Sequence, residues 1–348
     1  MALKRVCICG HFGFGEDLLN GQTVKTKTVT CAVEKALGRE EVLRCDTAGG
    51  VRRNWLLPFR LFSALRRCRN IVALPAENGL RVLMPLLFFY NRFFHRALHY
   101  VVIGGWLAEF LAKKKRLLRL LKGCAGIYVE TQEMKRVLED MGLANVLLLP
   151  NCKELKLPAE SELCYETEEP HRLCTFTRIM EEKGIGDAVL AVKMANEQLG
   201  RTAYTLDIYG PIDPAQKQWF ADLQRDFPPC VTYGGEIPYG ESTERLKDYF
   251  ALLFLTYYEG EGFAGTLIDA FSAAVPPLVS DWKYNCEIVR DGIDGAVVPP
   301  HDAAAACARL VAIAERPEEW VGMKKECLAR AALYTPEKAT AVLIENLR

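Results

Sequence analysis

The chain has 348 residues, half of them apolar, and its 44 basic residues balance its 44 acidic residues. Because domains usually hold roughly 100 to 200 residues, this length fits two domains that each bury a core. The composition excludes an intrinsically disordered chain and a uniformly basic nucleic-acid binder. We therefore expect a soluble globular protein.

The balanced total hides an uneven distribution of charge along the chain. Residues 1–165 carry 26 basic and 15 acidic residues, a net charge of +11, and the remainder carries −11. Between Thr47 and Lys122 alone the net charge is +13. A stretch with this excess attracts anionic partners.

Thirteen cysteines are scattered along the chain, and no signal peptide precedes them in the first ten residues. The odd number and irregular spacing favour a reducing, cytoplasmic compartment over a disulfide framework. Cys7 and Cys9 lie in an apolar run, and we interpret them as small buried hydrophobic residues rather than as half of a zinc site. No uncharged apolar window reaches the length of a membrane span, so we do not expect the chain to cross a bilayer.

The first half of the chain alternates short apolar runs with helical patterns. The first run, 6–9, leads into a loop with Gly10, Gly13, Gly15 and Gly21, which is the usual start of a nucleotide-handling α/β domain. Further strands are predicted at 70–74, 100–103, 126–129 and 145–149. This alternation predicts a doubly wound parallel sheet.

A polar, acidic segment with two prolines at 151–171 is typical of a connection between domains. After it, strands are predicted at 173–177, 204–209, 231–233, 251–256 and 277–280, with helices at 187–199 and 243–250. The sequence thus predicts a first Rossmann-like domain over 1–165 and a second over 166–335. The last part, 336–348, is predicted to form a helix that begins at Pro336 and could pack on either domain, including back on the first.

The segment 257–281 is the most informative for function, because a strand ends near Thr256 and a helix is expected to begin close to residue 263 or 264. The loop and the first helical turn hold Glu261, Gly262, Phe263, Ala264, Gly265 and Thr266. The free backbone N–H groups and the positive dipole end of such a turn suit an anion, for example a diphosphate.

Glu261 and Asp269 lie eight positions apart, which places Glu261 just before the helix and Asp269 about two turns into it. The two carboxylates could then reach opposite sides of one ligand. The alternative is that Glu261 caps the helix and Asp269 is a solvated helical residue.

Two cations follow another predicted strand, in the segment 177–184 that reads TRIMEEKG. A guanidinium from Arg178 and an ammonium from Lys183 in one strand-end loop suit a diphosphate and the charge on a leaving phosphate. Taken alone, each residue is better explained as surface charge.

In combination, these motifs resemble the family 4 retaining glycosyltransferases of glycosyltransferase group 1. Arg178, Lys183 and Gly184 are similar to the family's Arg and Lys-Gly element, and Glu261 and Asp269 to its paired acids. The stretch VPPLVSDWKYNCEIVRDGIDGAVVPPHD also follows the family's course. The resemblance runs through both halves and implies the GT-B fold, in which two Rossmann-like doubly wound domains face a central cleft.

The resemblance implies a role for each matching residue. Arg178 and Lys183 would contact the donor diphosphate, Glu261 would approach the donor sugar, and Asp269, one methylene shorter than the commoner Glu, would hold the ribose. Backbone N–H groups of residues 262–266 would hold phosphate and sugar. The segment NGQTVKT resembles the family's glycine loop and adds Gly21 and Gln22 as donor-binding residues.

The family's retaining chemistry implies that the acceptor hydroxyl attacks the face that the diphosphate leaves and that a departing phosphate oxygen takes its proton. No metal or other cofactor is implied, and the sequence contains no Asp-x-Asp motif. Many members place a His where this chain reads VVIGGWLAEF, with Gly104 to Trp106 at that point. We name no catalytic histidine, because His95 and His99 lie in an apolar stretch and are interpreted as packed residues.

The basic stretch also carries many aromatic residues, namely Trp55, Phe59, Phe62, Phe88, Phe89, Tyr90, Phe93, Phe94 and Trp106. Basic and aromatic residues together are typical of a surface that lies on anionic lipid headgroups, and 113–123 is predicted to be a basic amphipathic helix. The alternative is that the aromatics form core and the charges are solvated. Nucleic acid is disfavoured as a partner, because the aromatics occur in apolar runs and no binding module is recognisable.

The sequence therefore predicts a cytoplasmic enzyme, peripheral at the inner face of the cell membrane. It would move a hexose from a nucleotide-sugar donor, expected to be a UDP-sugar, to a hydroxyl of a glycan or lipid-linked saccharide, as in bacterial polysaccharide or glycolipid synthesis. The alternatives are a GT-B sugar-nucleotide epimerase and a non-catalytic GT-B scaffold subunit.

Overall fold

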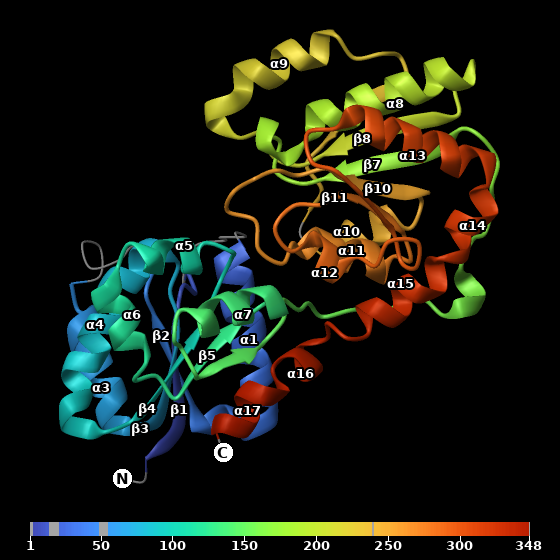
Figure 1. Ribbon diagram of the computed structural model, residues 1–348. Coiled ribbons are helices and arrows are strands. Elements are labelled where there is room, and N and C mark those ends of the chain that lie inside the picture. The colour runs from blue at the N-terminus through green and yellow to red at the C-terminus, as the bar shows by residue number, and fades with distance from the viewer. Residues whose placement is uncertain (1–2, 14–20, 49–54, 239, 348) are drawn as a thin grey trace. The chain divides into compact units, whose positions relative to one another are not determined.

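The computed structural model describes residues 3–13, 21–48, 55–238 and 240–347. The chain folds into two α/β units, shown in Figure 1. The first comprises Met1–Glu154 and Tyr334–Arg348, and the second Leu155–Leu333. Relative to the boundaries expected from the sequence, residues 155–165 belong to the second unit and the last 15 residues to the first.

A six-stranded parallel sheet in the order β2-β1-β3-β4-β5-β6 forms the centre of the first unit. Its strands are β1 (Lys4–Gly10), β2 (Val42–Asp46), β3 (Cys68–Leu74), β4 (Ala97–Val101), β5 (Gly126–Val129) and β6 (Val146–Leu148). Its helices are α1 (Gly21–Leu37), α3 (Leu57–Arg67), α4 (Glu77–Phe94), α5 (Leu107–Ala112), α6 (Lys115–Leu121), α7 (Gln132–Asp140), α16 (Pro336–Ala339) and α17 (Ala341–Leu347), with a 3₁₀ turn η1 (Arg39–Glu41).

The C-terminal segment forms two short helices instead of the single helix predicted from Pro336 onward. The Thr335 side chain caps the start of α16, which ends at Ala339, and the hydroxyl of the next residue, Thr340, donates to the Pro336 carbonyl. Both helices contact α1, and Leu343 and Leu347 of α17 are buried in the core of the first unit. The last residues are therefore part of the hydrophobic core that β1 and α1 begin.

The second unit repeats the plan with a parallel sheet in the order β12-β11-β10-β7-β8-β9. Its strands are β7 (His171–Phe176), β8 (Tyr204–Tyr209), β9 (Val231–Gly235), β10 (Ala251–Phe254), β11 (Pro277–Ser280) and β12 (Ala296–Val298). Its helices are α8 (Ile185–Leu199), α9 (Lys217–Arg225), α10 (Ser242–Leu246), α11 (Gly265–Ser272), α12 (Asn285–Ile288), α13 (Ala303–Glu315), α14 (Pro317–Gly322) and α15 (Lys324–Ala331). Three 3₁₀ turns are η2 (Glu160–Glu162), η3 (Glu181–Lys183) and η4 (Pro214–Gln216).

The structure confirms the predicted doubly wound α/β plan and adds two strands that the sequence analysis did not identify. These are β2 and β12, and each lies at an edge of its sheet. Only Val42 and Cys45 of β2 are fully buried, and β12 has three residues, so neither gives the continuous apolar run that marks a central strand.

The cysteines are free thiols throughout the described chain, and Cys7 and Cys9 are buried with their sulfurs 3.9 Å apart. Both lie on β1, within the sheet, as expected for small hydrophobic side chains. In the ranges given above, no helix is long and apolar enough to cross a membrane.

Candidate functional site

The centre of the candidate site in the second unit is an ion pair between Lys183 and Glu261. Lys183 follows β7 and Glu261 follows β10, and these are neighbouring parallel strands whose carboxyl ends lie at one edge of the sheet. The Lys183 Nζ lies 2.5 Å from Oε2 of Glu261, and the two side chains are only 11% and 9% exposed. The sequence predicted both residues for one site, and the structure brings them into direct contact.

Gly184 explains how Lys183 comes so close to the end of β10. Its φ is +70°, and a Cβ at this position would lie 2.1 Å from the Leu255 carbonyl oxygen. No other residue type fits this approach without moving the chain, because both the left-handed conformation and the contact exclude a side chain. The Lys-Gly pair therefore fixes the loop after β7 against the loop after β10.

Thr256 is a site residue that the sequence analysis did not assign. Its hydroxyl donates to Oε2 of Glu261 at 2.9 Å, and its carbonyl accepts from the Ser280 hydroxyl. Thr256 and Ser280 are both buried polar residues at the ends of apolar strands. A polar residue at such a position is the feature of the sequence that could have identified Thr256. Lys183 and Thr256 both contact Oε2 of Glu261. The described residues form no hydrogen bond to the other carboxylate oxygen, Oε1.

Arg178 is placed differently from Lys183. Its side chain is 60% exposed, and its Nη1 lies 3.7 Å from Oδ2 of Asp213, a long ion pair without a hydrogen bond. The loop that carries it is fixed by backbone bonds, because Ile179 donates to the Pro211 carbonyl and Asp213 donates to the Ile179 carbonyl. A weakly held, exposed guanidinium on a fixed loop can turn to a ligand at little energetic cost.

The start of α11 offers donors to an anion. Ala264 is the N-cap residue, and its side chain makes no capping hydrogen bond. The hydroxyl oxygen of Thr266, in the first turn, is buried and has no hydrogen-bond partner among the described residues. Uncapped N–H groups, a positive helix end and an unpaired buried hydroxyl together fit an anionic ligand at this turn.

The alternative interpretation of the two acids does not hold. Glu261 does not cap α11, since it lies three residues before the N-cap Ala264 and pairs with Lys183. Asp269 is not solvated, since only 4% of it is exposed. A buried carboxylate needs polar partners, and Asp269 has interactions within the structure.

A second group of side chains surrounds the same edge of the sheet. The ring centroids of Tyr257 and His301 are 3.9 Å apart, and the indole N–H of Trp282 donates to the Tyr258 carbonyl at 2.9 Å. Burial, together with the nearby carboxylates of Glu181, Asp187 and Glu182, raises the pKa of Tyr257 to about 12, so its hydroxyl stays protonated. These aromatic residues were not identified from the sequence.

The first unit places Gly21 and Gln22 at the start of α1. Gly21 is exposed, and the amide of Gln22 donates to the Leu74 carbonyl at the end of β3. Gln22 also lines a cavity of about 430 Å³ together with Glu77 and Asn78. Gly15, which the sequence analysis grouped with these residues, lies outside the described residues.

The two histidines of the apolar stretch have different environments. His99 is packed as expected, with Nδ1 3.1 Å from the Tyr128 hydroxyl, and its burial lowers its pKa to about 4. The interpretation of His95 as packed is wrong, because it is exposed and ends α4 in the left-handed conformation with φ 52°. Among the residues that the structure describes, no three His, Cys, Asp or Glu side chains are arranged to hold a metal ion.

Two α/β units, each with a parallel six-stranded sheet and flanking helices, are the architecture of the GT-B class of glycosyltransferase folds. HepE of Anabaena, solved with UDP, matches 100% of this chain and 99% of its own with a TM-score of 0.76 at 12% identity. Sucrose-phosphate synthase of Thermosynechococcus elongatus matches 98% of this chain and 97% of its own with a TM-score of 0.73 at 16% identity. At these identities the likeness shows the fold, which confirms the GT-B expectation.

The match to a family model lies in the second unit. Residues 165–326 match the family model described as "Glycosyl transferases group 1". The segment contains Arg178, Lys183, Glu261 and Asp269.

Curated glycosyltransferases also match this chain over part of their length. The amylovoran biosynthesis glycosyltransferase AmsK of Erwinia amylovora is 30% identical over 151 residues, which are 42% of this chain and 37% of AmsK. The GtfA subunit of the UDP-N-acetylglucosamine–peptide N-acetylglucosaminyltransferase of Streptococcus gordonii is 29% identical over 182 residues, 49% of this chain and 33% of the relative. The matched segments thus span about a third of these relatives.

Proposed function

We propose that this protein is a retaining glycosyltransferase that moves a sugar from a UDP-sugar to a hydroxyl of a glycan or lipid-linked saccharide. The observation that carries the proposal is the buried Lys183–Glu261 pair beside the uncapped start of α11. A cation, an acid and a helix start without a side-chain cap at one strand edge are groups that suit a sugar diphosphate.

The donor diphosphate would bind to the Lys183 ammonium, the Arg178 guanidinium and the N–H groups of residues 262–266. Thr266 supports this position, because a phosphate oxygen would supply the partner that its buried hydroxyl lacks. Lys183 and the helix start would stabilise the charge that develops on the leaving diphosphate. These groups can take the electrostatic role that a metal has in other transferases, and we propose a metal-independent reaction.

Glu261 and Asp269 would orient the rest of the donor. One oxygen of Glu261 is held by Lys183 and Thr256, and the other could accept from a sugar hydroxyl. Asp269, buried at the second turn of α11, would accept from the ribose. In the reaction, the bond from the anomeric carbon to the diphosphate breaks, the bond to the acceptor oxygen forms on the same face, and the acceptor proton passes to the departing phosphate oxygen. The protein's contribution is orientation and charge stabilisation.

The relatives support the donor class and suggest the kind of acceptor. HepE has been solved with UDP-glucose as well as with UDP, which supports a UDP-sugar donor here. AmsK acts in amylovoran biosynthesis, which supports a saccharide acceptor in bacterial polysaccharide or glycolipid synthesis. In the first unit, Glu77 and Asn78 in the cavity offer carboxylate and amide groups for acceptor hydroxyls, and Gly21 and Gln22 would contact the donor.

We further propose that the first unit lies on the anionic inner face of the cell membrane, with the protein otherwise in the cytoplasm. The helices α3 and α4 expose Phe59, Phe62, Phe89 and Phe93, between 41% and 70% of each side chain, and Trp55 precedes them at 70%. The alternative that these aromatics form core is wrong for these five residues. Exposed aromatics among 15 basic residues favour contact with anionic lipid.

Ligand binding and product stereochemistry test the enzymatic proposal. UDP should raise the midpoint of thermal unfolding more than GDP or ADP, because a ligand that binds only the folded state stabilises it. With a saccharide acceptor, NMR should show a product with the anomeric configuration of the donor. A changed sugar nucleotide without acceptor would instead indicate the epimerase alternative, and the absence of any turnover with intact UDP binding would indicate the scaffold alternative.

Vesicle binding tests the membrane proposal separately. Sedimentation with phosphatidylglycerol vesicles should weaken as salt rises, since surface charges are screened. Replacing Phe59 and Phe93 with Ser should reduce binding, while Leu333→Ser, a 48% exposed residue in the second unit, should not. Salt-independent binding, or equal loss in both variants, would contradict the proposal.

A further inference from the structure

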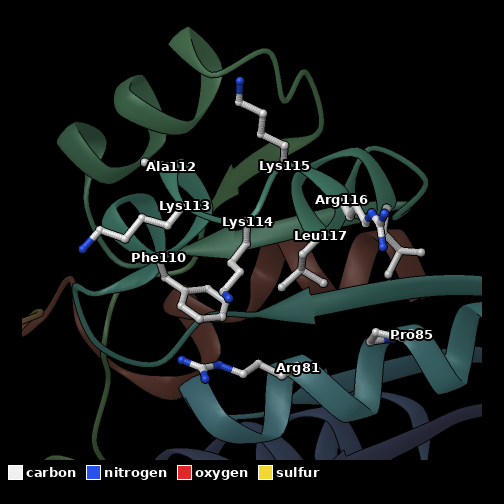
Figure 2. A pocket seen from close by; sticks show the side chains of 10 residues that line it. Arg81, Pro85, Phe110, Ala112, Lys113, Lys114, Lys115, Arg116 and Leu117 are labelled. Atoms are coloured by element: carbon white, nitrogen blue, oxygen red, sulfur yellow. The ribbon is translucent and has the colours of Figure 1, made fainter.

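A cavity of about 670 Å³ lies in the first unit between α4 and the consecutive helices α5 and α6, and none of its lining residues is assigned to the sites described above (Figure 2). It is lined by Arg81, Pro85, Phe110, Ala112, Lys113, Lys114, Lys115, Arg116, Leu117 and Leu120. Its volume is within the range of small-molecule pockets, which hold roughly 300 to 1,000 Å³. The lining combines cations and apolar side chains and contains no acidic residue.

The cationic part of the lining is concentrated in four consecutive residues, 113–116, which comprise the link between α5 and α6 and the first two residues of α6. All four are exposed, and no carboxylate in the described ranges forms an ion pair with any of them. Arg81, which pairs with Glu77 on the same helix at 2.5 Å, faces them from α4, with its guanidinium 4.8 Å from the centroid of the Phe110 ring. The four consecutive cations at 113–116 repel one another, and a multivalent anion would relieve the repulsion.

The apolar part of the lining forms the floor of the cavity. Phe110 is 9% exposed, and Leu117 and Leu120 are half-buried on α6. Pro85 lies in the middle of α4 and has no N–H, so the Arg81 carbonyl lacks its usual helical donor at the wall of the cavity. A free inorganic anion would use the cations alone and would leave this floor in contact with water.

The exposed aromatic residues of α4 follow the two α4 residues that line the cavity. Arg81, Pro85 and Phe89 are four residues apart, so they follow one another along one side of the helix. Phe89 is 54% exposed, and its ring lies 6.5 Å from that of Phe93. A ligand with its charge at Lys113–Arg116 could therefore extend an apolar chain past Pro85 toward Phe89.

We propose that this cavity binds the phosphate head of a lipid phosphomonoester or diphosphate, with the first carbons of its chain on Phe110, Leu117 and Leu120. Both halves of such a lipid match the lining, whereas an acidic peptide has no need of the apolar floor. The inference deepens the proposed membrane contact and rests on it, because the lipid reaches the cavity from a bilayer. It does not depend on glycosyl transfer.

The test compares two kinds of vesicle that carry similar surface charge. Phosphatidylcholine vesicles with phosphatidic acid present a phosphomonoester of charge between −1 and −2, and those with about twice as much phosphatidylglycerol present only phosphodiesters. The full-length protein should bind the phosphatidic acid vesicles at least about fivefold more tightly. Equal affinity for both would overturn the pocket while leaving general membrane binding intact.

Matched variants locate the effect. The triple variant Lys113→Gln/Lys114→Gln/Arg116→Gln should lose the preference for phosphatidic acid, and Leu117→Ser should weaken it while keeping all charges. The control Arg119→Gln/Lys122→Gln neutralises exposed cations of the same region that do not line the cavity, and it should keep the preference. If the control removes the preference as fully as the triple variant does, net charge and not the cavity recognises the lipid.

Two further measurements separate this inference from the proposed function. The triple variant should show the same shift in unfolding temperature with UDP as the unaltered protein, because no donor residue is changed. Inorganic diphosphate at millimolar concentration should not displace the protein from phosphatidic acid vesicles at constant ionic strength. Complete displacement would overturn the lipid assignment, because it would show that the cations alone account for binding.

Discussion

Lys183 and Glu261 are 78 residues apart in the chain, yet the Nζ of one lies 2.5 Å from Oε2 of the other. The pair is nearly buried, and the Lys183 ammonium also lies 4.7 Å from the centroid of the Tyr258 ring. Each charge compensates the other in a poorly solvated place, so removing either leaves an unpaired buried charge. The pair thus couples the conformation of two loops to the charge of the site.

Replacing Lys183 with Ala should abolish most of the activity. We expect kcat/KM to fall by roughly 10² to 10³-fold, since the ammonium would stabilise the leaving diphosphate in the transition state. UDP should also bind more weakly by about 1.5–3 kcal/mol, the usual contribution of a charge-assisted hydrogen bond. Lys193→Ala, an exposed residue on α8, serves as the control, and Lys183→Arg tests whether the charge alone suffices.

Replacing Glu261 with Gln should separate sugar orientation from phosphate binding. UDP affinity should remain within a few-fold, because UDP lacks the transferred sugar that Glu261 would contact. Turnover of the UDP-sugar should fall by about 10²-fold or more. Calorimetry with UDP and steady-state kinetics measure the two effects. A parallel loss of UDP affinity and turnover would contradict the assigned role.

Gly184 and Gly200 provide a matched pair of left-handed glycines at the two ends of α8. Their φ angles are +70° and +67°, but a Cβ at Gly184 would meet the Leu255 carbonyl, and a Cβ at Gly200 would meet nothing within 4 Å. Gly200→Ala should lower the free energy of unfolding by about 1 kcal/mol, the usual cost of a left-handed alanine. Gly184→Ala should cost at least about 2 kcal/mol more, as measured by denaturant unfolding. Equal costs would show that the loop absorbs the clash.

Thr266→Val should have opposite effects on stability and on binding. In the unliganded protein, the variant removes a buried hydroxyl that has no partner and should raise the free energy of unfolding by about 1 kcal/mol. The same change should weaken UDP binding if the hydroxyl donates to phosphate. Thr340→Val is the control, because the Thr340 hydroxyl donates to the Pro336 carbonyl and its loss should destabilise the protein.

His99 should make stability depend on pH in the acid range. Burial lowers its pKa to about 4, below the ordinary value of 6.5, so between these values the unfolded chain binds a proton that the folded chain does not. The free energy of unfolding should therefore fall as pH drops from 6.5 to 4, by up to roughly 1.4 kcal/mol per pH unit from this group. His99→Gln should flatten the slope relative to the unaltered protein.

The control for this experiment is His95→Asn. His95 is exposed, and asparagine tolerates its left-handed backbone, so the slope should not change. Burial also lowers the pKa of His171, but this residue is present in both variants and contributes equally. A His99→Gln protein with an unchanged slope would show that His99 does not control the acid response.

The sequence predicted the features that depend on continuous local pattern. The central strands of both sheets, the helix α8 and the start of α11 follow from apolar runs and spacing, and the two cations and two acids follow from motifs. The edge strand β2 was missed because only part of it is buried. The strand β4 begins at Ala97, earlier than predicted. Its start was missed because one of its buried residues, His99, is polar and interrupts the apolar pattern.

The contacts within the site depend on tertiary structure and could not be predicted from the sequence. Nothing local indicates that Lys183 pairs with Glu261 while Arg178 turns to Asp213, since these partners are brought together by strand order. Thr256 and Ser280 close apolar strands and could have been noticed for that reason. The cluster of Tyr257, Trp282 and His301 joins three separate loops, and their spacing in the sequence does not show that the three rings meet.

Leu343 and Leu347, near the end of the described chain, complete the hydrophobic core that Val6 and Val29 begin, and the amide of Asn70 donates to the Leu347 carbonyl at 3.3 Å. During synthesis, the ribosome therefore releases every segment of the second unit before the first unit can close its core. The second unit can fold from one continuous segment. The core of the first unit stays incomplete, with apolar surface exposed to solvent, until α16 and α17 have been synthesised.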